Sequence, residues 1–127
     1  MVPVLRNADR KSLIEIADET KKLSDDARSE RIKPDHMQGG TFTVSTLGSL
    51  GVETFTPVLN PPEVAILGVG GIFVNPRRTD VGVEHSDGMR LSLTINHQAV
   101  DGAPAARFLA DLALALETFE LSVATQN

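Results

Sequence analysis

The stretch LTINHQAVDGAP, residues 93–104, decides how the chain folds and where its chemistry lies. Its alternating apolar residues predict a strand that runs up to the histidine, and Pro104 suits the first turn of a helix. His97, Asp101 and Gly102 stand between the two elements in an H-x-x-x-D-G pattern. A base, a carboxylate and a glycine therefore meet at one element boundary, where loops held by rigid elements often carry chemistry.

The elements on either side of this stretch follow from periodicity. Apolar residues at helical spacing predict an amphipathic helix over residues 104–120. Upstream, residues 86–88 read Ser-Asp-Gly and predict a tight turn between strands at 80–85 and 89–96, because glycine readily supplies positive φ. Since the apolar residues of the second strand share one face with His97, we expect the histidine to emerge from the apolar side.

The first half of the chain predicts one helix and several strands. Ser12 and Glu15 form an S-x-x-E capping box ahead of apolar residues at helical spacing, which predicts a helix over residues 12–30. The apolar run 64–69 suits a central strand buried on both faces. Further strands are expected at residues 2–5 and 41–46, and the turn-rich segment 47–60 has room for a short strand at 54–59.

Composition narrows the class of protein. The 127 residues are enough for one core and too few for two comfortable domains. A net charge of −5 with dispersed Lys and Arg predicts neither a nucleic-acid nor an anionic-membrane partner. Without cysteine, no disulfide, thiolate nucleophile or cysteine metal site forms, and a reducing compartment fits. The longest apolar run, residues 64–74, is short and broken by glycines, so we expect no membrane span or signal peptide.

Three ordered motifs resemble one family. They are GGTFTVSTLG at residues 39–48, NPPEVAILGV at 60–69 and HQAVDG at 97–102. These resemble the catalytic domain of dihydrolipoamide acyltransferases, the E2 cores of 2-oxo acid dehydrogenase complexes, which are related in fold to chloramphenicol acetyltransferase. Residues 2–9 and the capped helix also resemble the middle of that domain. The resemblance implies that residues 1–127 are the C-terminal part of the catalytic domain. The strand expected at residues 2–5 starts almost at the first residue, so we expect further polypeptide upstream.

The resemblance carries expectations about architecture and partners. It implies an α+β fold, a two-layer sandwich in which a mixed β-sheet is covered by two long helices, as part of an incomplete domain. It implies a homotrimer or a multiple of trimers that works with a lipoyl domain and with the E1 and E3 components. Coenzyme A would be a substrate, and the lipoyl group would be carried on a domain outside this chain. The implied location is the cytoplasm, or the mitochondrial matrix in a eukaryote.

The chemistry of that family gives His97 a role. An acyl group moves between the thiols of dihydrolipoamide and coenzyme A, and a free thiol has a pKa near ~8.5, so it benefits from a base at neutral pH. A neutral imidazole at His97 can take the thiol proton as the sulfur attacks the thioester carbonyl, and return it to the leaving thiol. A hydrogen-bonded structural histidine is the alternative.

The same resemblance assigns Ser45 to the oxyanion of the tetrahedral intermediate. One such hydroxyl donor lowers the barrier by roughly 3 kcal/mol. Because the family's active site lies between two subunits of a trimer, Ser45 would face His97 of a neighbour. A structural role for Ser45 is the alternative, and Thr43 or Thr46 could take its place.

The roles expected for the other candidate site residues are less specific. Asp101 is expected to fix the loop or orient the histidine. Gly102 is expected to adopt a backbone conformation closed to other residues and, like Asn60, is a candidate coenzyme A-binding residue. Asn60 is equally a turn residue or a coenzyme A contact. The family commonly has D-H-R where this chain has Asn96 and Gln98 around the histidine, which could alter packing or substrate preference.

Three functional hypotheses follow. The first is an acyltransferase core, favoured by the joint presence of Ser45, His97 and Asp101. The second is a catalytically inactive oligomeric scaffold with the same fold, and the third is a truncated fragment that folds only as an oligomer. His36 and His85 have no metal-ligand spacing with His97 and are predicted to lie on the surface, so no metal site is expected.

Overall fold

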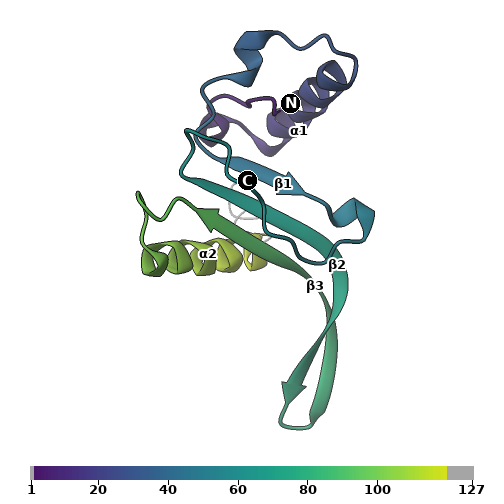
Figure 1. Ribbon diagram of the computed structural model, residues 1–127. Helices are drawn as coiled ribbons and strands as arrows, with labels where there is room; N and C mark the ends of the chain where they lie inside the picture. The colour runs from purple at the N-terminus through teal and green to yellow at the C-terminus, as the bar shows by residue number, and fades with distance from the viewer. Residues whose placement is uncertain (1, 120–127) are drawn as a thin grey trace. The chain divides into compact units, whose positions relative to one another are not determined.

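The computed structural model describes residues 2–119, which belong to two compact units, Met1–Thr41 and Phe42–Asn127. The first unit holds the 3-10 turn η1 (Ala8–Arg10), helix α1 (Leu13–Arg28) and the 3-10 turn η2 (Pro34–Met37). The second unit holds strand β1 (Thr43–Thr46), the 3-10 turn η3 (Gly48–Leu50), strands β2 (Ala65–Thr79) and β3 (Gly82–Ile95), and helix α2 (Gly102–Glu117). Figure 1 labels the helices and strands.

Helix α1 begins at the predicted capping box. The Glu15 N–H donates to the Ser12 hydroxyl at 3.3 Å, and the Ser12 N–H donates to the Glu15 carboxylate at 2.7 Å. These two bonds satisfy amide groups that the first turn of a helix leaves without partners. The bond from the Ser12 backbone, followed by that from its side chain, lowers the pKa of the Glu15 carboxyl below its usual value. The sequence prediction of this helix is confirmed.

Residues 2–5 form no strand, which corrects the sequence prediction. The Val4 N–H donates to the His36 carbonyl at 2.7 Å, and the Arg6 guanidinium donates to the carbonyls of Asp35 and Gln38. A strand needs a ladder of bonds to a neighbouring strand, and β-propensity alone does not supply one. The start of the chain is instead held by single bonds from Val4 and Arg6 to η2 and its flank.

The second unit is built on a three-stranded sheet of order β1-β2-β3. Strand β1 runs parallel to β2, and β3 runs antiparallel to it, so the predicted central strand is indeed central. Ile66 and Leu67 of β2 are buried, as the apolar run predicts. A mixed sheet with two long helices confirms the predicted α+β class.

The turn between β2 and β3 lies six residues earlier than the sequence predicts. Thr79 pairs with Gly82 around the two-residue connection Asp80–Val81, and Gly82 has a φ of 143°. Gly88, the expected turn residue, lies inside β3 opposite Phe73. A local Ser-Asp-Gly signal is outweighed here by pairing along the whole ladder, which fixes where the chain reverses. The strand expected at 54–59 is likewise absent.

The two faces of the sheet have different neighbours. Directly paired residues point to the same side, so Ser45, Gly68 and Ser92 share one face. Residues 52–57 cross this face as an extended segment: Thr94 donates its hydroxyl to the Pro57 carbonyl at 2.7 Å. A Cβ placed on Gly70 would lie 1.8 Å from the carbonyl oxygen of Glu53, so backbone packs directly on backbone there.

Helix α2 lies against β3, on the side to which Phe42 points by alternation with Thr43. The rings of Phe42 and Phe108 meet edge-on with centroids 6.1 Å apart. The helix starts at Gly102, two residues before the predicted start, and none of its residues is fully buried. The second long helix is confirmed up to Glu117.

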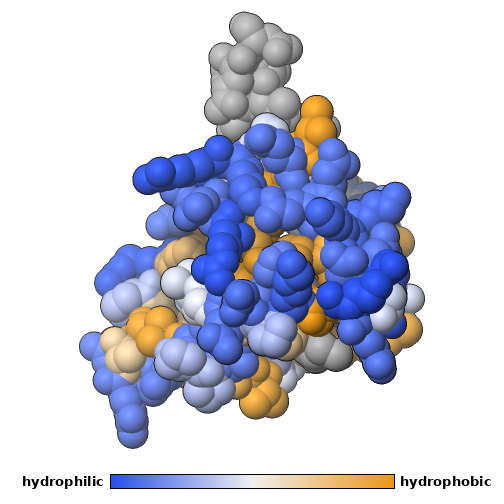
Figure 2. Space-filling model, turned by 90° about the horizontal axis from the view of Figure 1, so that it is seen from above, coloured by the Kyte–Doolittle hydropathy of each residue, from blue (hydrophilic) through white to orange (hydrophobic). Residues whose placement is uncertain are grey.

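Large apolar side chains remain exposed in the second unit. The exposed fraction is 93% at Val81 and 74% at Ile72, on the hairpin beyond the three-stranded region, and 59% at Leu114 on α2. In Figure 2 each described residue is coloured by its hydropathy. Isolated two-stranded hairpins are marginally stable, and exposed apolar patches mark interaction sites.

Within residues 2–119, no helix combines the length and hydrophobicity needed to cross a bilayer.

Candidate functional site

The turn that carries His97 is held by Asn96. The Asn96 N–H donates to the Val64 carbonyl at 2.8 Å and so extends the β2–β3 ladder by one bond. Its side-chain oxygen accepts the Gln98 N–H at 3.0 Å, and its carbonyl accepts the Ala99 N–H at 2.9 Å. This is the way asparagine stabilises turns. In the sequence, Asn96 stands out as a departure from the family's pattern, although an asparagine directly after a strand is also a turn signal.

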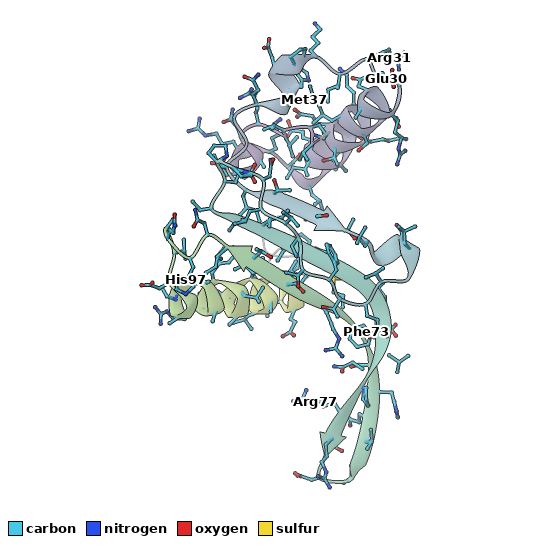
Figure 3. The ribbon with its side chains drawn as sticks, in the orientation of Figure 1. Glu30, Arg31, Met37, Phe73, Arg77 and His97 are labelled. Carbon is cyan, nitrogen blue, oxygen red and sulfur yellow. The ribbon has the colours of Figure 1, made fainter. Side chains whose placement is uncertain are left out.

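His97, Asp101 and Gly102 come together at one end of the sheet. All three are exposed, and Figure 3 draws His97 beside the start of α2. Asp101 caps α2 with its backbone only: its carbonyl accepts the Ala105 N–H at 3.3 Å. Within residues 2–119, the side chains of His97 and Asp101 make no hydrogen bond or ion pair with each other or with any other described residue.

The expectation for the backbone of Gly102 is wrong. Gly102 is the first residue of α2 and is not among the glycines with positive φ. A Cβ placed there would have no neighbour within 4 Å. The first turn of a helix accepts ordinary residues, so neither conformation nor space requires glycine at this position.

Three hydroxyls on β1 were candidates for the oxyanion donor, and the structure separates them. Thr43 donates its hydroxyl to Glu63 at 2.5 Å, and Thr46 donates to the Val69 carbonyl at 3.0 Å. The half-buried Ser45 hydroxyl has no hydrogen-bond partner within residues 2–119. Of the three, it alone is available to a ligand.

Ser45 and His97 of one chain lie far apart. Ser45 is aligned through Gly68 with Ser92 of β3, and His97 follows Ser92 by five positions, beyond the end of β3. At ~3.3 Å per residue and ~4.8 Å per strand, this places the two residues more than about 15 Å apart. Two side chains at that separation cannot contact one carbonyl group. A site that uses both residues needs a second copy of the chain.

Asn60 serves a turn. Its carbonyl accepts the Glu63 N–H at 3.0 Å, and its side-chain amide donates to the Glu63 carboxylate at 3.4 Å. These two hydrogen bonds give Asn60 the role of a turn residue, which is one of the two roles expected from the sequence.

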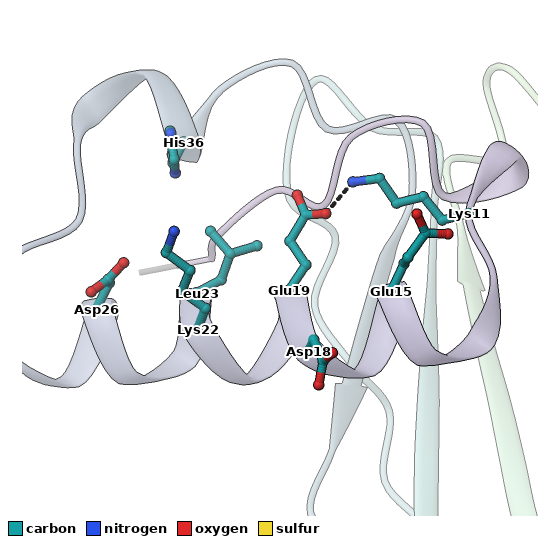
Figure 4. A pocket seen from close by; sticks show the side chains of 8 residues that line it. All are labelled: Lys11, Glu15, Asp18, Glu19, Lys22, Leu23, Asp26 and His36. Carbon is teal, nitrogen blue, oxygen red and sulfur yellow. Dashed lines mark hydrogen bonds and ion pairs between the residues drawn. The ribbon is translucent and has the colours of Figure 1, made fainter.

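The first unit has a pocket between α1 and η2, which Figure 4 shows. Lys11 and Glu19 form an ion pair at one end of it. No group of three potential metal-binding side chains occurs among residues 2–119. His36, at the pocket, and His85, on β3, are exposed, as the sequence predicts. The pocket contains none of the predicted catalytic residues and is lined by Lys11, Glu15, Asp18, Glu19, Lys22, Leu23, Asp26 and His36.

Comparisons with known proteins agree on one family. The family model of the 2-oxoacid dehydrogenases acyltransferase (catalytic domain) matches residues 1–124. The dihydrolipoyllysine-residue acetyltransferase component of the acetoin cleaving system of Bacillus subtilis is 44% identical over 117 residues, which are 92% of this chain and 29% of that protein. The chain therefore spans less than a third of the length of this curated relative.

Solved structures give the same result. The dihydrolipoamide acetyltransferase of Azotobacter vinelandii matches with a TM-score of 0.86 and 44% identity over 90% of this chain and 47% of that chain. The cubic core of a pyruvate dehydrogenase multienzyme complex matches with a TM-score of 0.86 and 43% identity, with the same coverage. The Azotobacter structure was used to investigate one serine, one histidine and one asparagine in the catalytic mechanism. Ser45, His97 and Asp101 have the same spacing along this chain, with aspartate in place of asparagine.

Proposed function

Because the chain belongs to the family of 2-oxoacid dehydrogenase acyltransferase catalytic domains, we propose that it moves an acyl group between dihydrolipoamide and coenzyme A. One observation carries the proposal. Ser45, His97 and the polar residue Asp101 have the same spacing as the serine, histidine and asparagine investigated in the catalytic mechanism of the Azotobacter protein. The hydroxyl of Ser45, which has no hydrogen-bond partner in the described part of the chain, and the exposed imidazole of His97 support it.

The reaction needs one proton acceptor and one oxyanion donor. The His97 imidazole takes the proton of the attacking thiol as its sulfur bonds to the thioester carbonyl carbon. The carbonyl oxygen becomes an oxyanion, to which the Ser45 hydroxyl donates a hydrogen bond. When the intermediate collapses, the bond to the leaving sulfur breaks and the imidazolium returns the proton to that sulfur. Asp101 follows the loop and caps α2 through its backbone carbonyl.

The separation of the two groups supports an assembly of several copies of the chain. Ser45 of one protomer would meet His97 of the next, in a homotrimer or a multiple of trimers. Exposed apolar side chains on α2 and on the hairpin support contact between copies, and the relative described as a cubic core is itself an assembly. Coenzyme A would be a substrate, the lipoyl group would be carried on a domain outside this chain, and E1 and E3 components would be the partners in a larger complex.

The Ser45 hydroxyl gives the first test. Ser45→Ala should lower kcat for acetyl transfer from acetyl coenzyme A to dihydrolipoamide by about 10²-fold, because one oxyanion donor is lost. The control is Ser49→Ala, which removes an exposed serine from η3 and should keep the native rate. Full activity in Ser45→Ala would contradict the oxyanion assignment. A folded, trimeric and inactive native protein would favour the scaffold hypothesis instead.

A further inference from the structure

Glu63 is an acid with unusual surroundings. Its exposed fraction is 8%, and Glu63 and Thr43 are the two buried polar side chains among the described residues. No lysine, arginine or histidine within residues 2–119 forms an ion pair with it. A buried carboxylate without a counter-charge depends on hydrogen bonds from neutral groups. Among the described residues, the donors are the Thr43 hydroxyl and the Asn60 amide.

These bonds tie the turn before β2 to the start of β1. The Thr43 hydroxyl donates to one carboxylate oxygen at 2.5 Å, and the Asn60 amide donates to the other at 3.4 Å. The residue after Glu63 is held as well, because the Val64 carbonyl accepts the Asn96 N–H. The carboxylate therefore joins β1 to a point that is already fixed on the β2–β3 ladder.

Strand β1 needs such an anchor. It has only four residues and pairs with β2 along one edge. Short edge strands have few ladder bonds to hold them in place. Thr43 and Ser45 are two positions apart, so they lie on the same face of β1, opposite Ile66 and Gly68. A shift of Thr43 along or away from β2 would carry Ser45 with it.

From this geometry we infer that Glu63 is a positioning residue for the acyl transfer, acting through the Thr43 hydroxyl on the placement of Ser45. The inference rests on the proposed function, and it goes beyond that function by adding a buried pair that touches no substrate. Hydrogen-bond donors to an oxyanion act only from a fixed position, and displacements of about 1 Å cost up to 10²-fold in rate.

The test compares two substitutions of Thr43. Thr43→Val keeps the shape of the side chain and removes its hydroxyl, whereas Thr43→Ser keeps the hydroxyl. We expect Thr43→Val to lower kcat about tenfold, with little change in the KM of either substrate, and Thr43→Ser to stay within about twofold of native. In a Ser45→Ala background, Thr43→Val should cause no further loss, because the group it positions is gone.

Two results overturn the inference. One is a native kcat in Thr43→Val. The other is an equal loss of kcat from Thr43→Val with and without the Ser45 hydroxyl, which would indicate a general structural role. If Ser45→Ala is itself fully active, the proposed role of Ser45 fails, and the catalytic part of this inference fails with it.

An assay that does not depend on catalysis distinguishes failure of the Glu63 inference from failure of the proposed role of Ser45. Amide hydrogen exchange at residues 44–46 should be about tenfold faster in Thr43→Val than in Thr43→Ser, with exchange in α1 unchanged, since opening of β1 is local. Unchanged exchange at residues 44–46 would show that the Glu63–Thr43 bond does not hold the strand, whatever the activity of the protein.

Discussion

Replacing His97 with alanine should lower kcat for acyl transfer by about 10²–10⁴-fold, the usual contribution of a general base. The substitution removes the group that accepts the thiol proton and leaves the turn intact, because Asn96 supplies the hydrogen bonds of the turn. His97 is exposed and its side chain bonds to no other residue within 2–119, so the free energy of unfolding should change by less than about 0.5 kcal/mol.

The measurement is the rate of acetyl transfer at saturating acetyl coenzyme A and dihydrolipoamide, with circular dichroism to verify the fold. His36→Ala is the matched control, because His36 is also exposed and lies in the first unit. A His97→Ala protein that keeps the native rate would refute the assignment of the base. Equal losses in both variants would point to damage unrelated to proton transfer.

Replacing Gly70 with alanine should destabilise the protein by about 3 kcal/mol, at the upper end of the usual cost of overpacking. The added Cβ would lie 1.8 Å from the Glu53 carbonyl oxygen, a distance at which the backbone of one segment must move. Moving residues 52–57 would also disturb the Thr94–Pro57 bond and the bond from the Gly71 N–H to the Val52 carbonyl.

Urea unfolding followed by circular dichroism, at one fixed protein concentration, measures this loss. Gly88→Ala is the matched control: it also changes a strand glycine, but its Cβ would meet Asn75 at an ordinary 3.4 Å. Its effect should be below about 1 kcal/mol. If the two variants unfold at the same urea concentration, the close backbone contact at Gly70 does not exist in solution.

Much of the framework could be predicted from local patterns. The Ser12–Glu15 pair marks the start of α1 because capping is decided within four residues. The run 64–69 marks the central strand because a strand buried on both faces is apolar throughout. The local pattern misplaces the turn between β2 and β3, because Ser86–Gly88 carries a good turn signal and the register of a long ladder cannot be read locally.

The candidate site was predictable only in part, for the same reason. His97, Asp101 and Gly102 are close in sequence, so their proximity in space needed no knowledge of the fold. The distance between Ser45 and His97 depends on strand order and register, which appear only in the assembled sheet. The bond between Thr43 and Glu63 joins residues twenty positions apart and gives no local signal.

The wide separation of Ser45 and His97 has a genetic consequence. If every protomer lends its serine to one neighbour and its histidine to another, the alleles Ser45→Ala and His97→Ala damage different halves of each centre. Chains of the two kinds, co-expressed in one cell, would form mixed rings in which some centres receive both intact groups. The two alleles should therefore complement each other, and the co-purified mixture should turn over substrate faster than either variant alone.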